Sequence, residues 1–200
     1  MGKKALHAIC ACIFLAVSIV FILLQFVSAF EIESSINYTR AEVRIEKGWN
    51  FLLGFYEPSQ LNSANIAPHN IGGIYSFDSQ SQKYMLVRPN YNSVNFNASY
   101  LKNMAFFVYS NKAASAEYIH PKPMPIEELQ LYAGWNYLGI TEELIGSSLD
   151  EVDGSCGIEG AYKWDSSAQE WSVFSADSNF DWDDLMTGIA VSVKNDCHLG

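Results

Sequence analysis

One pattern occurs twice in this chain, as Gly48-Trp49-Asn50-Phe51-Leu52 and as Gly134-Trp135-Asn136-Tyr137-Leu138. The copies are 86 residues apart, and two apolar residues precede each of them in matching register. Glycine permits backbone angles that other residues avoid, and asparagine bonds its own local backbone and fixes a turn. The pattern therefore predicts a turn that leads into a strand. Because Trp49 and Trp135 recur at one position and tryptophan brings a large apolar area, we expect both in the core.

Two further landmarks repeat in the same order. Residues 75–84 parallel residues 162–171, and residues 101–111 parallel residues 185–195. Self-similarity at a fixed spacing is the sequence signature of repeated structural units. We therefore predict two tandem units, residues 30–119 and 126–200. The segment 120–125 between them has alternating prolines, which stiffen a chain and suit a linker.

Each unit is predicted to be mostly β-structure. Residues 42–46 alternate charged and apolar side chains, which is typical of a half-buried strand. Polar turns within residues 74–87 and 158–174 indicate hairpins, and Ser148 with Glu151 fits a capping box for a short helix. Other short helices are expected at residues 98–103 and 182–186, and a strand at residues 189–194. The predicted fold class is mainly β, with α+β character at the margins, preceded by an N-terminal signal or anchor helix.

These residues resemble a known kind of module. Gly-Trp-Asn followed by a hydrophobic residue, then an aromatic-Asp hairpin with a tryptophan, then a strand that begins with glycine, is similar to the Gly-Trp-Asn repeat modules of exported archaeal and bacterial surface proteins. The resemblance is clearest over residues 134–200. In the first unit Tyr84 stands where the second has Trp171, and the two cysteines are missing. The resemblance implies a surface or secreted module and supplies no catalytic residues.

Residues 1–29 indicate export. Lys3 and Lys4 precede an apolar run that ends at Val27-Ser28-Ala29, so the segment has the basic, hydrophobic and small-residue regions of a signal peptide. The run is also long enough to span a bilayer. Cleavage after Ala29 is favoured because charged residues resume at once, but a retained membrane anchor and a pilin-like assembly helix stay open.

Charge excludes some partners. The chain has 12 basic and 22 acidic residues and a formal net charge of −10. A surface this negative disfavours nucleic acid and anionic membranes. The expected partners are an extracellular protein, a carbohydrate or further copies of the chain, with membrane contact only through an uncleaved N-terminal segment.

Two cysteines follow residue 29, Cys156 and Cys197. An even pair in an oxidising compartment predicts one disulfide; a nucleophilic Cys156 is the alternative. The sequons at Asn37 and Asn97 predict glycans only if the host glycosylates exported proteins.

The best candidate for a metal site is the acidic stretch at residues 177–184. It places oxygen ligands at alternate positions, and calcium is the cation that such ligands fit: Asp177, Asn179, Asp181 and Asp183. The alternative is a solvated loop with aspartates at a helix N-terminus. No other cofactor is expected.

No catalytic motif stands out. The sequence lacks a Gly-x-Ser-x-Gly elbow, a His-Glu-x-x-His helix and a phosphate-binding glycine loop. His69, His120 and His198 are read as surface residues. Core packing is expected for Trp164, Trp171 and even Trp182, although tryptophans also serve as platforms on which sugars stack.

The function favoured is a non-catalytic exported module that acts by binding or assembly, such as adhesion. The alternatives are a pilin-like or surface-layer filament subunit and a secreted carbohydrate-active hydrolase.

Overall fold

The computed structural model describes residues 38–55, 61–62, 67–88 and 102–200. Within these residues the chain is mainly β, with one α-helix, α3 (Leu149–Val152). The predicted fold class is therefore confirmed in its coarse form. No helix in the described part is both long and apolar enough to cross a membrane. The N-terminal segment and residues 98–101 of the helix predicted at 98–103 lie outside the described residues, and residues 102 and 103 form a turn.

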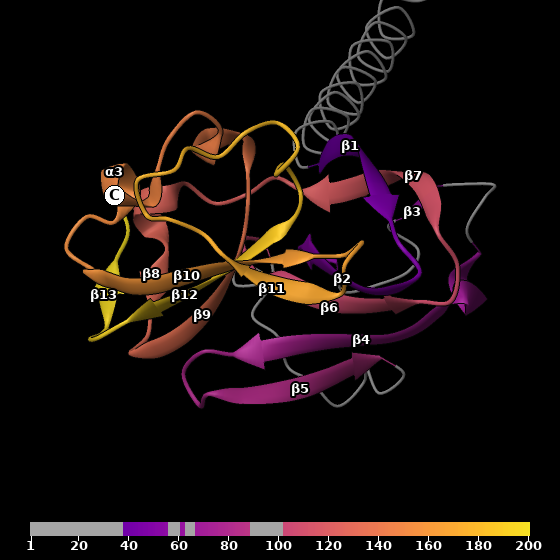
Figure 1. The fold of residues 1–200 in the computed structure, drawn as a ribbon, viewed down its shortest axis with the longest axis horizontal. Helices are drawn as coiled ribbons and strands as arrows, with labels where there is room; N and C mark the ends of the chain where they lie inside the picture. The colour runs from indigo at the N-terminus through magenta and orange to yellow at the C-terminus, as the bar shows by residue number, and fades with distance from the viewer. Residues whose placement is uncertain (1–37, 56–60, 63–66, 89–101) are drawn as a thin grey trace, which may run out of the picture. The chain divides into compact units, whose positions relative to one another are not determined.

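Two four-stranded antiparallel sheets are at the centre of the fold (Figure 1). The first has the order β2-β6-β4-β5, with bounds Gly48–Leu53, Ala105–Ser110, Ile71–Asp78 and Lys83–Arg88. The second has the order β9-β12-β10-β11, with bounds Gly134–Gly139, Gly188–Val193, Ile158–Asp165 and Glu170–Val173. When the four strands of each sheet are numbered along the chain, both sheets have the same spatial order: first, last, second, third.

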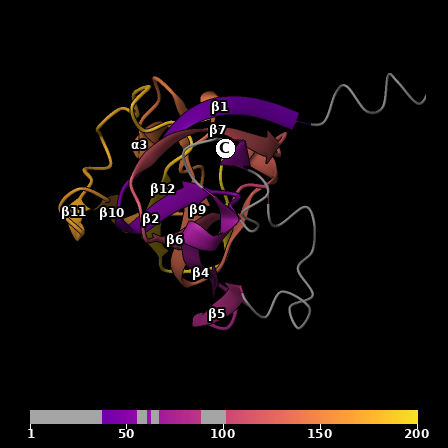
Figure 2. The same ribbon diagram turned by 90° about the vertical axis from the view of Figure 1, so that its right-hand side faces the viewer.

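Two small sheets complete the topology. A three-stranded sheet has the order β1-β7-β3, with bounds Tyr38–Ile45, Ala114–Pro121 and Leu61–Asn62. A two-stranded sheet joins β13 (Cys197–His198) to β8 (Gln130–Leu131). Figure 2 shows β1 and β7 on one side of β2 and β6.

The outer face of each four-stranded sheet has its own hydrophobic core. The first core lies between the first sheet and the β1-β7 strands, and its fully buried members include Ile45, Ile74 and Phe106. The second core is formed by the alternate residues Ile189, Val191 and Val193 of β12 with residues of α3 and the surrounding loops. The strand and the shared face predicted at residues 189–194 are thus confirmed. Burying each such aliphatic side chain contributes about 1.5–3 kcal/mol.

The inner faces of the two sheets meet in a third cluster, which is aromatic. Its buried members are Phe51, Phe77, Ala105, Tyr137 and Ala190. The rings of Phe51 and Tyr137 make an edge contact at 5.0 Å, and those of Phe77 and Tyr137 stack at 4.7 Å. Aromatic pairs at these distances add about 0.5–1.5 kcal/mol to the burial term.

Backbone hydrogen bonds also join the two sheets. At the end of β2 the N–H of Leu53 donates to the carbonyl of Met186, which precedes β12. At the end of β9 the N–H of Gly139 donates to the carbonyl of Asn103, which precedes β6. Because each sheet bonds to the other at two corresponding places, residues 39–200 form one compact unit.

Several local predictions are met. The capping box is present, with Ser148 Oγ accepting from the Glu151 N–H and Glu151 Oε2 accepting from the Ser148 N–H. The hairpins β4-β5 and β10-β11 lie where the polar turns placed them. The helix expected at 182–186 is wrong: those residues form turns, and the turns end at Met186, whose φ of 66° is incompatible with a helix.

The segment predicted as a linker is built into the fold. His120 lies in β7, next to its last residue, and is fully buried, so its reading as a surface histidine is wrong. The side chain of Asn103 exchanges two hydrogen bonds with the backbone of Met124. The duplication of the unit stays a prediction.

Candidate binding surface

The asparagine of each Gly-Trp-Asn copy is buried. Asn50 and Asn136 are 0% and 2% exposed. Asn50 Oδ1 accepts from the N–H of Glu46 at 2.8 Å, and its Nδ2 donates to the carbonyls of Glu46 and Gly48. Asn136 makes the same bonds with the residues four and two positions upstream. Because an unpaired buried amide costs about 1–3 kcal/mol, these bonds fix the turn before each strand.

The tryptophan of each copy is held through its backbone by a glutamine of the opposite sheet. Gln169, in the β10-β11 turn, accepts from the Trp49 N–H at 2.8 Å and donates to the Trp49 carbonyl at 2.9 Å. Gln82, in the β4-β5 turn, accepts from the Trp135 N–H and donates to the Trp135 carbonyl, both at 2.9 Å. We call these pairs the Gln169 contact and the Gln82 contact.

The glycines are required by these contacts. Gly48 and Gly134 have φ angles of +106° and +97°, which only glycine adopts without strain. A Cβ atom at Gly48 would lie 2.5 Å from Gln169 Oε1, and one at Gly134 would lie 2.6 Å from Gln82 Oε1. The motif therefore leaves room for the glutamine amide beside the strand.

Sequence reasoning missed the two glutamines. A signal was present, because in both hairpins a glutamine follows an aspartate by four residues, as Asp78…Gln82 and Asp165…Gln169. Asp165 Oδ1 accepts from the N–H groups of Ala168 and Ser167, and these bonds lower the pKa of Asp165. The aspartate shapes the turn, and the turn holds the glutamine at a φ of 55–59°.

The exposure of the tryptophans differs from the prediction. Trp135, Trp171 and Trp182 are 39%, 38% and 69% exposed, so core packing is wrong for all three. Trp49 and Trp164 are half-buried, and Trp164 packs against the aromatic cluster and donates its Nε1–H to the Trp49 carbonyl. Trp171 is 38% exposed while its ring contacts Phe51, Phe107 and Trp164. The repeated tryptophans lie at the rim of the aromatic face.

A groove of about 460 Å³ opens at this rim. Eight residues from both sheets line it: Phe77, Gln82, Tyr84, Trp135, Tyr137, Tyr162, Trp171 and Ala190. Three of its residues, Tyr84, Trp135 and Trp171, are among the five exposed large hydrophobic residues of the described chain. We call it the larger groove. Grooves of this size lined by aromatic rings and a few polar groups are the usual form of small-ligand sites.

A second groove, of about 330 Å³, lies beside the first. Trp49, Tyr75, Tyr84, Phe107 and Trp164 line it, and Tyr84 lines both grooves. Trp49 and Tyr75 occupy the positions in the first sheet that Trp135 and Tyr162 occupy in the second. We call it the smaller groove. The two grooves thus have corresponding walls in the two sheets.

The hydroxyl of Tyr84 is the polar group between the grooves. It is hydrogen-bonded to the hydroxyl of Tyr137, a residue that the contact between the sheets leaves only 7% exposed. Burial, and secondarily the bond to Tyr84, raise the pKa of Tyr137 well above its ordinary range. The Tyr137 hydroxyl therefore stays neutral at any physiological pH.

The disulfide prediction is confirmed. Cys156 and Cys197 are bonded, with their Cα atoms 5.1 Å apart, and they tie β13 to the loop after α3. The nucleophile alternative for Cys156 is thereby excluded in the oxidised protein. Both predicted sequons, at Asn37 and Asn97, lie outside the described residues.

The four proposed calcium ligands are all exposed. Asp177 accepts from the Ser175 hydroxyl, and Asp181 accepts from the N–H groups of Asp183 and Asp184. In the described ranges no three His, Cys, Asp or Glu side chains are grouped so as to hold a metal ion. The calcium site stays a prediction, tested by whether a chelator lowers the melting temperature.

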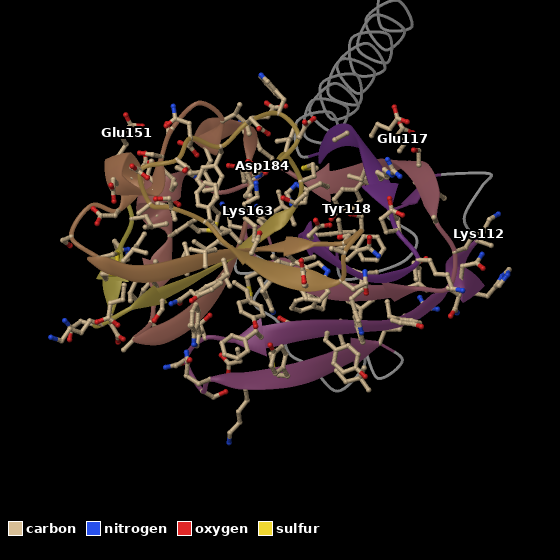
Figure 3. All side chains as sticks on the ribbon, viewed as in Figure 1. Lys112, Glu117, Tyr118, Glu151, Lys163 and Asp184 are labelled. Atoms are coloured by element: carbon tan, nitrogen blue, oxygen red, sulfur yellow. A yellow bond between two sulfur atoms is a disulfide. The ribbon has the colours of Figure 1, made fainter. Side chains whose placement is uncertain are left out.

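Asp184, which was not singled out in the sequence, is the buried acid of this stretch. Figure 3 shows it beside Lys163 of β10, with which it forms a hydrogen-bonded ion pair. Lys163 also lies 5.3 Å from the ring centre of Phe174. Asp184 Oδ2 accepts from the Asp181 N–H. The pair anchors the acidic loop to the second sheet.

A third cavity, of about 240 Å³, contains the buried His120. Glu142 and Glu143 lie at its exposed edge. His120 Nε2 is bonded to the carbonyl of Lys102, and Nδ1 has no hydrogen-bond partner in the described part of the chain. Burial lowers the pKa of His120 to about 4. A histidine that is neutral and fully covered is placed for packing and not for proton transfer with a bound substrate.

Comparison with models of known protein families, with curated proteins and with solved structures gave no match.

Proposed function

We propose that this protein is an exported, non-catalytic binding module, built from two copies of one β-unit, that holds its ligand on the aromatic rim between the sheets. The single observation that carries the proposal is the clustering of exposed aromatic rings at two grooves with corresponding walls. Exposed tryptophan and tyrosine side chains gathered in one patch mark interaction sites on soluble proteins. Scattered exposure would need no such explanation.

A binding role accounts for the chemistry of the rim better than hydrolysis does. The residues that line the two grooves include no carboxylate. A glycoside hydrolase needs two carboxyl groups on either side of the bond to be cleaved. Glu142 and Glu143 line the cavity of His120, and Glu128 lines a further cavity of about 150 Å³; neither cavity is lined by aromatic rings from both sheets.

Export is the other half of the proposal. It is supported by the basic and apolar pattern of residues 1–29 and by the disulfide, which persists in oxidising compartments. N-terminal sequencing of the protein recovered outside the cytoplasm tests it. A start at residue 30 is expected, and an intact leader on a soluble cytoplasmic protein would contradict it.

Binding is tested by sedimentation with envelope fragments of the cells that make the protein. The wild-type protein should pellet with the fragments, and the double variant Trp135→Ala/Trp171→Ala should stay in the supernatant. Trp182→Ala is the matched control, because Trp182 is 69% exposed but lines neither groove. If the double variant pellets as fully as the wild type, the aromatic rim is not the binding surface.

Assembly is a second candidate function, and one observation favours it. Strand β11 is an edge strand of the second sheet, and all four of its residues are exposed, with Val173 at 77%. An exposed edge strand is a template for pairing with another chain. Analytical ultracentrifugation decides: concentration-dependent association that is abolished by Val173→Lys supports it, and a monomer at all concentrations refutes it.

A further inference from the structure

The chemistry of the two grooves also indicates what they hold. We infer that the ligand is a neutral carbohydrate chain whose successive sugar rings stack on the rings of the larger and smaller grooves. The inference rests on the proposed binding function and narrows it to one class of ligand. Four features of the described residues support it, in the charge, the hydrogen-bonding groups, the strand edges and the repetition of the site.

Charge is absent from both grooves. None of the lining residues is ionisable near neutral pH, in a chain that has 34 charged residues. Strand alternation explains this, since Lys83 and Glu170 neighbour Tyr84 and Trp171 but their side chains point to the opposite faces of β5 and β11. An anionic ligand would find no cation here and would meet the negative field of the whole protein. The grooves therefore suit a neutral ligand.

The polar groups that remain fit hydroxyl-rich ligands. The indole N–H groups of Trp135 and Trp171 have no hydrogen-bond partner among the described residues, and both side chains are more than a third exposed. The Tyr84 hydroxyl keeps capacity beyond its bond to Tyr137. The faces of aromatic rings carry partial negative charge, which attracts the C–H groups on the flat side of a sugar ring. Ring face and adjacent donor together match a sugar and its hydroxyl groups.

A peptide that adds a strand at the repeated tryptophans is disfavoured, because the strand edge at those two positions is already occupied. Strands β9 and β2 are edge strands, as are β11 and β5, and a peptide could extend a sheet at β9 or β2 only by bonding to the outward N–H and carbonyl groups of those strands. At Trp135 those groups are bonded to Gln82, and at Trp49 to Gln169. Recognition at these positions is left to side chains alone.

The repetition of the site fits a polymer. The two grooves adjoin at Tyr84 and have corresponding tryptophan and tyrosine walls. A polysaccharide offers the same chemical group at regular intervals, so one chain can occupy both grooves. Two linked contacts of modest strength then give tight binding without any new interaction.

The experiment extends the sedimentation assay with three treatments of the envelope fragments. Periodate oxidation cleaves sugars at vicinal hydroxyls and spares the peptide backbone, whereas protease digestion removes protein ligands. The third treatment adds soluble neutral polysaccharides that carry vicinal hydroxyls as competitors, namely dextran, mannan and xylan, with alginate as the anionic control. The protein used is the whole exported chain.

The inference predicts that periodate abolishes binding, that protease leaves it, and that at least one neutral polysaccharide competes while alginate does not. Trp171→Ala should weaken affinity for that polysaccharide by about tenfold or more, and Trp182→Ala should leave it unchanged. Loss of binding after protease but not after periodate would overturn the carbohydrate assignment while leaving the binding function intact. Equal sedimentation of the aromatic variants and the wild type would instead overturn the binding function itself.

Discussion

The substitution Gly134→Ala tests how the Gly-Trp-Asn pattern acts in the fold. Two costs are expected from the structure. An alanine held at a φ of +97° costs about 1–2 kcal/mol of backbone strain. Its Cβ, 2.6 Å from Gln82 Oε1, displaces the amide and breaks the two hydrogen bonds to Trp135, each worth about 0.5–1.5 kcal/mol net. The sum is about 2–5 kcal/mol, a large part of the stability of an ordinary domain.

A matched control separates the two costs. Gly146 has a φ of +89°, and no atom lies within 4 Å of a Cβ added there. Gly146→Ala therefore carries the strain without the collision. The difference between the two substitutions in the free energy of unfolding should be about 1–3 kcal/mol, which is the worth of the Gln82 contact.

The assay is urea unfolding of the disulfide-bonded protein, with Gln82→Ala completing a double-mutant cycle. If Gln82 and Gly134 act through one contact, Gly134→Ala costs less in the Gln82→Ala background than in the wild type, by about 1–3 kcal/mol. If Gly134→Ala and Gly146→Ala cost the same and the two substitutions in the cycle are additive, the contact does not hold the sheets together and the reasoning is refuted.

Three further predictions follow from single sites. The buried His120 has a pKa of about 4 against 6.5 when unfolded, so the unfolded state takes up the proton first and stability falls as the pH drops from about 6.5 to 4, by up to about 3 kcal/mol. Urea midpoints at pH 7 and pH 4.5 should show this drop shrinking in His120→Leu; an unchanged drop would refute it. Replacing Cys156 and Cys197 together by alanine should lower the unfolding free energy by up to about 4 kcal/mol, because the bond closes a loop with a separation of 41 residues; an unshifted melting temperature would show that the bond does not constrain the unfolded chain. Gly139→Ala places a Cβ 1.9 Å from Leu53 Cδ1 where the sheets cross, so a loss of about 1–3 kcal/mol is expected in calorimetry, and wild-type stability would mean that the crossing is looser than described.

The local β-structure was predictable from the sequence because its causes are local. Strand alternation at residues 42–46, the polar hairpin turns and the Ser148 capping box each depend on residues a few positions apart. The pairing of Cys156 with Cys197 was predictable because only one pairing was available after residue 29. The acidic loop shows where such prediction ends. The sequence singled out four residues in the stretch 177–183 as metal ligands, all of them exposed, and gave no sign that Asp184 is the buried acid.

The candidate site could not be predicted in the same way. A tryptophan that recurs at a repeat position has the same pattern whether it is buried or at a rim, and Trp135 is at the rim. Its exposure depends on how closely the second sheet approaches, which is fixed by contacts between residues more than fifty positions apart, such as Gln82 with Trp135.

The sequence by itself determined the class of fold, the position of the strands and hairpins, the disulfide pair and the acidic character of the chain, because propensity, periodicity and composition act over short distances. Only the tertiary structure decided which aromatic rings are covered. Two sheets that cross at Leu53 and Gly139 bury the centre of their shared aromatic face and leave its rim open. The grooves arise from that crossing, and no single segment of the chain contains the information that sets it.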